Sequence, residues 1–113
     1  MKTDPNCIFC KIRDKQIPSS QVYSDEQVIV FKDINPKAPV HLLIVPREHV
    51  ASLNELEQQH ADLIAHIILL LPKLAKEQGL DEGFRTVINT GAGGGQIVFH
   101  LHIHLLGGKT FAA

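Results

Sequence analysis

Apolar residues and histidines alternate through the stretch FHLHIHL at residues 99–105. His100, His102 and His104 take every second position, and apolar residues fill the positions around them. Because successive side chains of a β-strand point to opposite faces of a sheet, this spacing predicts a strand with three imidazoles on one face and four apolar groups on the other. A single histidine is more often a hydrogen-bonded core or surface residue, but three in register indicate a functional cluster.

A glycine-rich loop precedes this stretch, with Gly91, Gly93, Gly94 and Gly95 inside the sequence NTGAGGGQ. Glycine adopts backbone angles that are closed to other residues, and a run of such amides can form a concavity that binds anions. An ordinary flexible connection explains the glycines about equally well when they are considered alone. Together with the histidines, the loop indicates a phosphate held beside a nucleophile.

The composition is that of an ordinary globular protein, with 113 residues, 44% hydrophobic content and a formal net charge of -1. A chain of this length buries about two thirds of its unfolded surface, so we expect residues 1–113 to form a single domain. The charge is not typical of proteins that bind nucleic acid or acidic membranes, which favours a small molecule or another protein as partner. Without a secretory signal or an apolar stretch of transmembrane length, the sequence predicts a cytoplasmic protein.

Two cysteines form a C-x-x-C motif at Cys7 and Cys10. Cytoplasmic cysteines are more often thiols or metal ligands than a disulfide. The spacing can place two thiolates on one tetrahedral ion, but it supplies half of a site, for which His49 and His100 are candidate ligands. Two unmetallated thiols and a redox pair are the alternatives, and the redox pair is less favoured because the motif does not follow a strand of a βαβ unit. A zinc ion here would be structural.

The order of the remaining patterns predicts an α+β fold with an antiparallel sheet and helices on one side of it. A short turn or helix at about 7–13 precedes strands at 21–24, 28–32 and 41–45, a helix from about 57 to 78, and a strand at 84–89. Pro72 lacks the N–H that would bond the Ile68 carbonyl, so we expect a kink in the helix there, or a full break.

The long helix is apolar on more than one side. Leu63 and Leu70 lie off its main stripe, and residues 67–71 form an unbroken apolar run. One sheet face cannot cover all of this surface, so we interpret the second side as a subunit interface, most simply of a twofold homodimer. The main stripe consists of six residues at helical spacing, Ile64, Ile67, Ile68, Leu71, Leu74 and Ala75.

Two polar residues lie at strand ends in the first half of the chain. Asp33 follows the strand at 28–32 and can accept both hydroxyl groups of a ribose, although an ordinary turn-capping aspartate is the better interpretation from the sequence alone. His41 begins the next strand and would lie beside the histidine stretch if the two strands are neighbours.

These motifs resemble those of the histidine triad family, whose signature of alternating histidines and apolar residues matches HLHIHLL. The similarity extends over nearly the whole chain, through CIFCKI, FKDINPKAPVHLLIVPREH, the GGGQ loop and LLGG. The chain looks most similar to the Hint branch, purine nucleoside phosphoramidases, rather than to diadenosine polyphosphate hydrolases or galactose phosphate uridylyltransferases. The resemblance implies a five-stranded antiparallel sheet with one long helix and a short N-terminal helix, in a homodimer with a continuous sheet.

The resemblance also implies a mechanism for a purine mononucleotide substrate. His102 would attack the α-phosphorus of a nucleoside 5′-phosphoramidate and form a nucleotidyl-histidine that water then hydrolyses, a role that suits an imidazole neutral near pH 7. His104 would contact the phosphate, and His41 would complete the polar network. Three groups would hold the non-bridging oxygens, namely the amides of Gly95 and Gln96 and the side chain of Asn89.

Further positions match the family's nucleotide and metal sites. Asp33 and Ile34 match the residues that hold the ribose. The residues that match the apolar purine slot are Ile8, Phe9, Ile12, Phe31 and Leu43. In metal-binding bacterial relatives the zinc ligands are two cysteines, the histidine after the central strand and the first triad histidine, which here are Cys7, Cys10, His49 and His100. We therefore expect a structural zinc ion and no organic cofactor.

One position departs from the Hint pattern. Ile97 stands where that branch commonly has a serine near the leaving group, so no serine hydroxyl is available there to relay a proton. A lower turnover or a different preference for the leaving amine is expected. Two other functions stay open, dinucleoside polyphosphate hydrolysis and a nucleotide-binding interaction module with weak activity.

Overall fold

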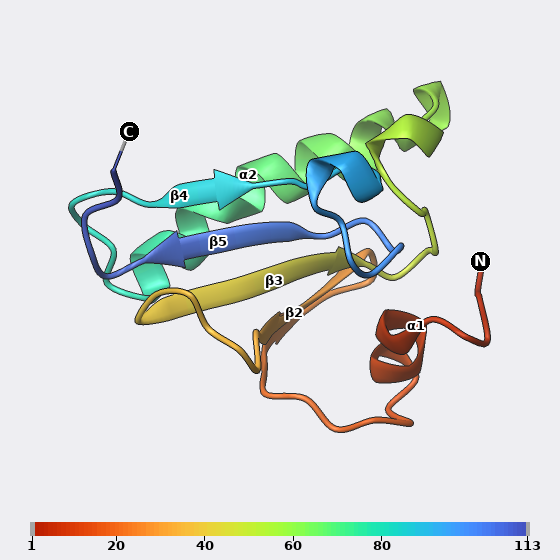
Figure 1. The fold of residues 1–113 in the computed structure, drawn as a ribbon, viewed down its shortest axis with the longest axis horizontal. Helices are drawn as coiled ribbons and strands as arrows, with labels where there is room; N and C mark the ends of the chain where they lie inside the picture. Colours follow the sequence, from red (N-terminus) through yellow and green to blue (C-terminus); the bar gives the residue numbers. More distant parts are fainter. Residues whose placement is uncertain (1, 113) are drawn as a thin grey trace.

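The structure, a computed structural model, describes residues 2–112 and contains the predicted five-stranded antiparallel sheet with one long and one short α-helix (Figure 1). Met1 and Ala113, the two ends of the predicted domain, lie outside the described residues. In chain order the elements are α1 (Ile8–Arg13), β1 (Gln21–Ser24), β2 (Val28–Lys32), β3 (Val40–Pro46), α2 (Ala61–Glu77), β4 (Arg85–Val87) and β5 (Ile103–Gly107).

The strand order across the sheet is β1-β2-β3-β5-β4, so the last strand lies between β3 and the edge strand β4. The chain crosses the sheet through α2 and returns along the edge before β5 enters the centre. In the register of the central pairs, Leu43 lies opposite His104 and His41 lies opposite Leu106. The strand that contains His41 is therefore a neighbour of the histidine stretch, which is the arrangement that places His41 beside it.

The two faces of the sheet carry different clusters, because alternate residues of each strand point to opposite sides. One face packs on α2 through the alternate strand residues Val28, Val30, Leu42, Ile44, Ile103 and Leu105. The other face packs on α1 through Ile29, Phe31, Leu43 and Val45. The two helices therefore cover opposite faces, so the expectation of helices on one side of the sheet was wrong. Figure 1 shows α1 near the arrowhead of β3 and the start of β5. The histidines of the candidate site lie on this α1 side.

Helix α2 begins after a 3-10 turn at Gln58–His60 and continues through Pro72, so the full break considered for the sequence does not occur. Its buried stripe includes Ile67, Leu71 and Leu74 as predicted, but two assignments were wrong. Ile68 is 50% exposed and Leu70 is buried, because the stripe that meets the sheet is narrower and rotated toward Leu70. Among residues 2–112, no helix is both long enough and apolar enough to span a bilayer.

The histidine stretch is only partly a strand. β5 begins at Ile103, so His100 and His102 precede it, and Phe99 is 49% exposed instead of facing the core. Both neighbouring strands stop pairing with β5 at this point: the last β4 pair joins Val87 to His104, and the last β3 pair joins Ile44 to Ile103. β4 spans Arg85–Val87, against the predicted 84–89. The buried apolar alternation persists through Leu101 and into the strand.

Candidate functional site

A cavity of about 550 Å³ opens on the α1 side of the sheet, within the size range of small-molecule sites. His41, His102 and His104 lie in its wall. Of the residues predicted to bind a nucleotide, the cavity wall includes Ile8, Phe9, Ile12, Phe31, Asp33, Ile34, Leu43, Asn89 and Gly95. Residues from α1, from the four strands β2 to β5 and from the glycine loop thus meet at one site.

A chain of hydrogen bonds fixes the protonation of two of the histidines. The backbone N–H of Lys37 donates to Nδ1 of His41 at 3.0 Å, and this nitrogen must therefore be unprotonated. A neutral His41 then carries its proton on Nε2, which lies 2.9 Å from Nδ1 of His104 and donates to it. His104 is consequently left with its own proton on Nε2, as a donor at the cavity wall.

His102 is held in the opposite tautomer. Its Nδ1 lies 2.7 Å from the backbone carbonyl oxygen of His100, which can only accept, so Nδ1 carries the proton and Nε2 has a free lone pair. The ring also packs edge-on against Phe9 at 5.0 Å and against His104 at 5.0 Å between centroids. The site therefore combines an unprotonated nitrogen with a neighbouring N–H donor.

Burial keeps these rings neutral at physiological pH. It lowers the pKa of His102 and of His41, and it lowers that of His104 to about 4, with the neighbouring rings of His102 and His41 adding to the effect. The Asp33 carboxylate opposes the shift at all three groups. A neutral imidazole is the form that acts as a nucleophile.

The glycine loop is held mainly by its own hydrogen bonds. The amides of Gly95 and Gln96 donate to carbonyl oxygens within the loop, at 3.1 and 3.0 Å, so the bonds predicted from them to phosphate oxygens are not available in this conformation. The Gln96 side chain accepts from the Gly91 amide and donates to the Ala51 and Val98 carbonyls, and this residue lies outside the cavity wall. Asn89 donates to the Gly94 carbonyl at 2.8 Å and keeps its second amide hydrogen.

Asp33 serves two purposes. One carboxylate oxygen accepts from the Asn35 amide at 2.8 Å, as in the turn-capping interpretation, while the other lies 3.5 Å from Nε2 of His41 at the cavity wall. Next to it, Ile34 is 89% exposed and also lines the cavity. The opposite part of the wall is apolar, with the rings of Phe9 and Phe31 packed edge-to-face at 5.5 Å.

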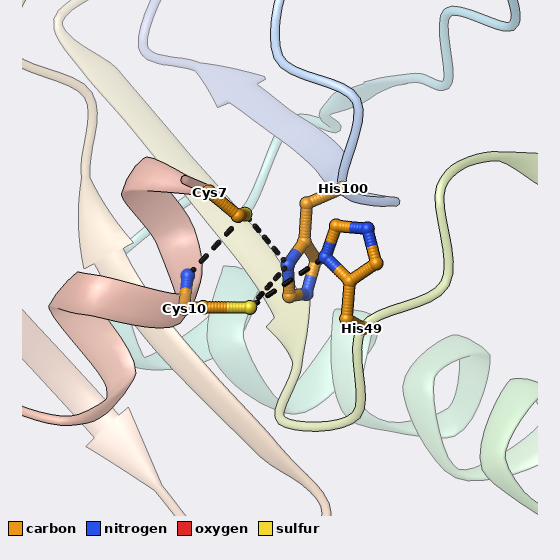
Figure 2. A group of neighbouring side chains, drawn as sticks. All are labelled: Cys7, Cys10, His49 and His100. Carbon is orange, nitrogen blue, oxygen red and sulfur yellow. Dashed lines mark hydrogen bonds between the residues drawn. The ribbon is translucent and has the colours of Figure 1, made fainter. Parts of the chain in front are cut away.

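The four predicted metal ligands converge outside the cavity (Figure 2). Cys7 is the N-cap residue of α1, Cys10 lies in that helix, His49 lies in the loop after β3, and His100 lies in the segment before β5. Their ligand atoms lie within 4.8 Å of one another, and both thiols are free and buried. Residues separated by more than 90 positions in the sequence thus meet at one point.

The geometry of this cluster fits a tetrahedral zinc ion. Nδ1 of His100 lies 3.2 Å from the Cys7 sulfur and 3.6 Å from that of Cys10, and Nδ1 of His49 lies 3.5 Å from the Cys10 sulfur. Zn–S and Zn–N bonds at tetrahedral angles require about 3.5 Å between sulfur and nitrogen. Nε2 of His100 donates to the Pro46 carbonyl at 2.8 Å, which leaves Nδ1 unprotonated and able to ligate. Four protein ligands make a closed, structural site.

A second group of potential ligands, Asp33, His41 and His104, does not fit a metal as it stands. Nδ1 of His41 accepts from the Lys37 amide, so Nε2 must keep its proton and cannot offer a lone pair. This group is a hydrogen-bond chain.

Comparison with known proteins identifies the family. The family model described as "Scavenger mRNA decapping enzyme C-term binding" matches residues 6–111. Protein HitA of Neisseria gonorrhoeae is 54% identical over 102 residues, which cover 90% of this chain and 95% of the relative. The chain belongs to the histidine triad family. It lies in the Hint-like branch, since Adenylylsulfatase HINT1 of Arabidopsis thaliana is 43% identical over 95% of this chain and 74% of that protein.

Other proteins are similar over most of their length. The 14 kDa zinc-binding protein of Zea mays is 44% identical, over 94% of this chain and 84% of the relative. A solved histidine triad protein from Clostridium difficile superposes with a TM-score of 0.94 at 46% identity, over 98% of this chain and 97% of that one. A HIT family hydrolase from Legionella pneumophila gives a TM-score of 0.92 at 44% identity, over 95% and 96%. The protein is a hydrolase of this family.

Several contributors to the site have no signature in the sequence. The backbone groups of Lys37 and Pro46 fix the tautomers of His41 and His100, and any residue type supplies such groups. Lys32 and Lys37 are also among the residues that line the cavity, but isolated lysines carry no signal. Buried Arg13 was also missed: its guanidinium donates to the Arg47 carbonyl at 2.6 Å and ties α1 to the loop that carries His49.

Proposed function

We propose that this protein hydrolyses purine nucleoside 5′-phosphoramidates through a nucleotidyl-histidine on His102. The observation that carries the proposal is the tautomer of His102: Nδ1 donates to the His100 carbonyl, and the lone pair of Nε2 is left free on a ring that lines the cavity. In the first step Nε2 attacks the α-phosphorus, the P–N bond to the amine breaks, and the amine leaves after taking a proton from solvent. Water then cleaves the new P–N bond and releases the nucleoside monophosphate.

The groups around His102 support charge stabilisation at the phosphorus. The Nε2–H of His104 is a donor at the cavity wall, set by His41, and the second amide hydrogen of Asn89 is another. Two lysines, Lys32 and Lys37, are among the residues that line the cavity, and positive charge near it favours an anionic ligand. Donors fixed before the substrate arrives need no reorganisation as negative charge shifts onto the oxygens.

The nucleoside would lie along the remaining walls. The edge-to-face rings of Phe9 and Phe31, with Ile8, Ile12 and Leu43, supply an apolar slot for a purine. The Asp33 oxygen that does not cap the turn is the candidate acceptor for ribose hydroxyls, with Ile34 beside it. Ile97 is 88% exposed at the cavity wall, on the loop that follows the glycines, and it presents an apolar surface where the family serine would supply a hydroxyl.

The test is hydrolysis of an adenosine 5′-phosphoramidate of a fluorescent amine. We expect His102→Ala to lose turnover while His66→Ala, which removes a histidine on α2 outside the cavity wall, keeps it. Wild-type turnover by His102→Ala would contradict the assignment of the nucleophile. Diadenosine polyphosphates and adenylyl sulfate, compared side by side, separate the alternative hydrolase activities. Tight binding of a purine mononucleotide without an adduct or turnover would favour the interaction module.

We also propose a zinc ion at Cys7, Cys10, His49 and His100, supported by the sulfur–nitrogen distances, the His100 tautomer and the name of the maize relative. Zinc in a closed site of this kind supplies folding energy and no chemistry of its own. Elemental analysis of protein purified without an affinity tag tests the assignment. Protein that is fully folded but free of metal as purified would contradict it.

A homodimer is the proposed assembly. Ile68 and Leu69 of α2 are 50% and 74% exposed, and β4 leaves one edge of the sheet unpaired within the described residues. A twofold partner would cover the helix and extend the sheet across that edge. Leu69→Glu should convert a dimer to monomers in sedimentation experiments, whereas the exposed α2 variant Lys73→Glu should not. The cytoplasm is the proposed compartment, in which paired thiolates persist as metal ligands.

A further inference from the structure

We propose that the metal site also sets the geometry of the nucleophile, with His100 as the positioning residue that couples the two. The inference rests on the proposed function for its catalytic meaning. It concerns the link between two groups of residues: the four metal ligands, and the nucleotide cavity that none of the four lines.

The first link runs through the backbone of His100. Its side chain contributes Nδ1 to the metal cluster, and its carbonyl oxygen accepts the Nδ1–H of His102 at 2.7 Å. The residue is fully buried, and its second ring nitrogen is held by the Pro46 carbonyl at 2.8 Å. A ring fixed at both nitrogens fixes its own backbone, and the direction of the carbonyl determines where the free nitrogen of His102 points.

The second link runs through Phe9, which immediately precedes the ligand Cys10 on α1. The Phe9 ring lies edge-on to both histidine rings, at 5.9 Å from His100 and 5.0 Å from His102 between centroids. Phe9 also packs with both cysteines in the cluster that includes the cavity residues Phe31 and Leu43. Because α1 has only six residues, the position of Cys10 largely determines the position of this ring.

Both links predict the same consequence when the metal is removed. Two thiols and two imidazoles offer weak mutual hydrogen bonds in place of four coordinate bonds, so α1 and the segment before β5 lose their common anchor. The His102 ring then loses its fixed acceptor, and the apolar wall separates from the sheet. If the metal only stabilised the fold, its removal would change the unfolding temperature and leave nucleotide affinity and the His102 tautomer unchanged.

The first experiment compares zinc-loaded and zinc-free wild-type protein without using turnover. Titration calorimetry with adenosine monophosphate measures affinity, and ¹⁵N NMR of the His102 ring reports which nitrogen carries the proton. We expect affinity to fall at least about tenfold without zinc, and the Nδ1–H signal to give way to a mixture of tautomers. Equal affinity and an unchanged tautomer in folded, zinc-free protein would overturn the inference.

A matched pair of variants keeps the test decisive if the zinc-free protein does not fold. His100→Gln and His49→Gln each remove one ligand and leave three, and zinc content and thermal unfolding verify that both are loaded and folded. Only His100 is bonded to His102. We expect His100→Gln to weaken nucleotide binding about tenfold and to change the His102 ring spectrum, with less than about a twofold effect for His49→Gln. Equal effects of the two substitutions would contradict the coupling.

The two readouts also separate this inference from the proposed function. The His102 ring spectrum can be recorded without any nucleotide, so it tests the coupling even if the protein hydrolyses no phosphoramidate. Conversely, a protein that turns over the substrate equally well with and without zinc would retain the proposed function and lose the coupling.

Discussion

Replacing His41 tests the hydrogen-bond chain that prepares the candidate active site. His41 receives the Lys37 amide on Nδ1 and donates from Nε2 to His104, at 3.0 and 2.9 Å. His41→Leu fills a similar volume but provides neither contact. His41→Gln is the matched control, because its side-chain amide keeps one acceptor and a donor. Both substitutions leave His102 and the metal ligands in place.

The structure gives the size of the expected effect. His41 is 5% exposed, so the leucine variant leaves the acceptor of His104 without its partner in a largely dry site. An unsatisfied buried group costs about 1–3 kcal/mol. If the transition state bears that cost, the rate falls between about fivefold and about two hundredfold, since about 1.4 kcal/mol corresponds to a factor of ten. The loss should occur mainly in kcat, because the apolar slot that would hold the base is not altered.

The assay is steady-state hydrolysis of the fluorescent adenosine phosphoramidate, with thermal unfolding as a check on folding. We expect the order wild type, then His41→Gln, then His41→Leu. If the leucine variant is folded and retains the wild-type kcat, the hydrogen bond from His41 does not prepare His104 and the reasoning is refuted. A change confined to KM would show that His41 contributes to binding instead.

Three further predictions concern stability. Burial lowers the pKa of His104 in the folded protein to about 4, so between about pH 6.5 and 4 the unfolded chain binds more protons than the folded one. The free energy of unfolding should therefore fall as the pH is lowered through that window, and it should fall less steeply in His104→Gln. Burial raises the pKa of Asp25, but hydrogen bonds to its carboxylate outweigh this effect and lower the pKa to about 2. Its contribution to the free energy of unfolding is therefore present above about pH 4 and should disappear toward pH 2. Acid unfolding of Asp25→Asn, compared with wild type, measures this contribution. A Cβ on Gly107 would lie 2.5 Å from a Leu80 methyl group, so Gly107→Ala should cost about 1 kcal/mol in chemical denaturation, and Leu80→Ala should suppress that cost.

The elements of the fold were largely predictable because their signals are local. β-branched and aromatic residues identified β2, a short apolar run identified β3, and helical spacing identified α2. The start of β5 at Ile103 was not predictable, since it depends on where pairing with β3 and β4 stops. The exposure of Ile68 likewise depends on how α2 is rotated on the sheet, a tertiary property that the apolar run of the helix does not encode.

The membership of the candidate site was more predictable than its hydrogen bonding. Motifs indicated the histidines, the cysteines and the apolar wall, because these residue types carry the chemistry. The sequence did not indicate that the amides of Gly95 and Gln96 bond within the loop, since a glycine-rich loop can bond either to a ligand or to itself. It also missed the contact of His66 with Asp25, at 2.7 Å between a helix and a turn 41 positions apart, which no motif marks.

The most direct test is to locate the covalent adduct. Wild-type protein is mixed with excess adenosine phosphoramidate, quenched within a single turnover, digested, and analysed by mass spectrometry and ³¹P NMR. The tautomer of His102 predicts a nucleotidyl group on Nε2 of this residue, formed and consumed at the rate of turnover. An adduct on His104, or product release with no adduct at any time, would contradict the account.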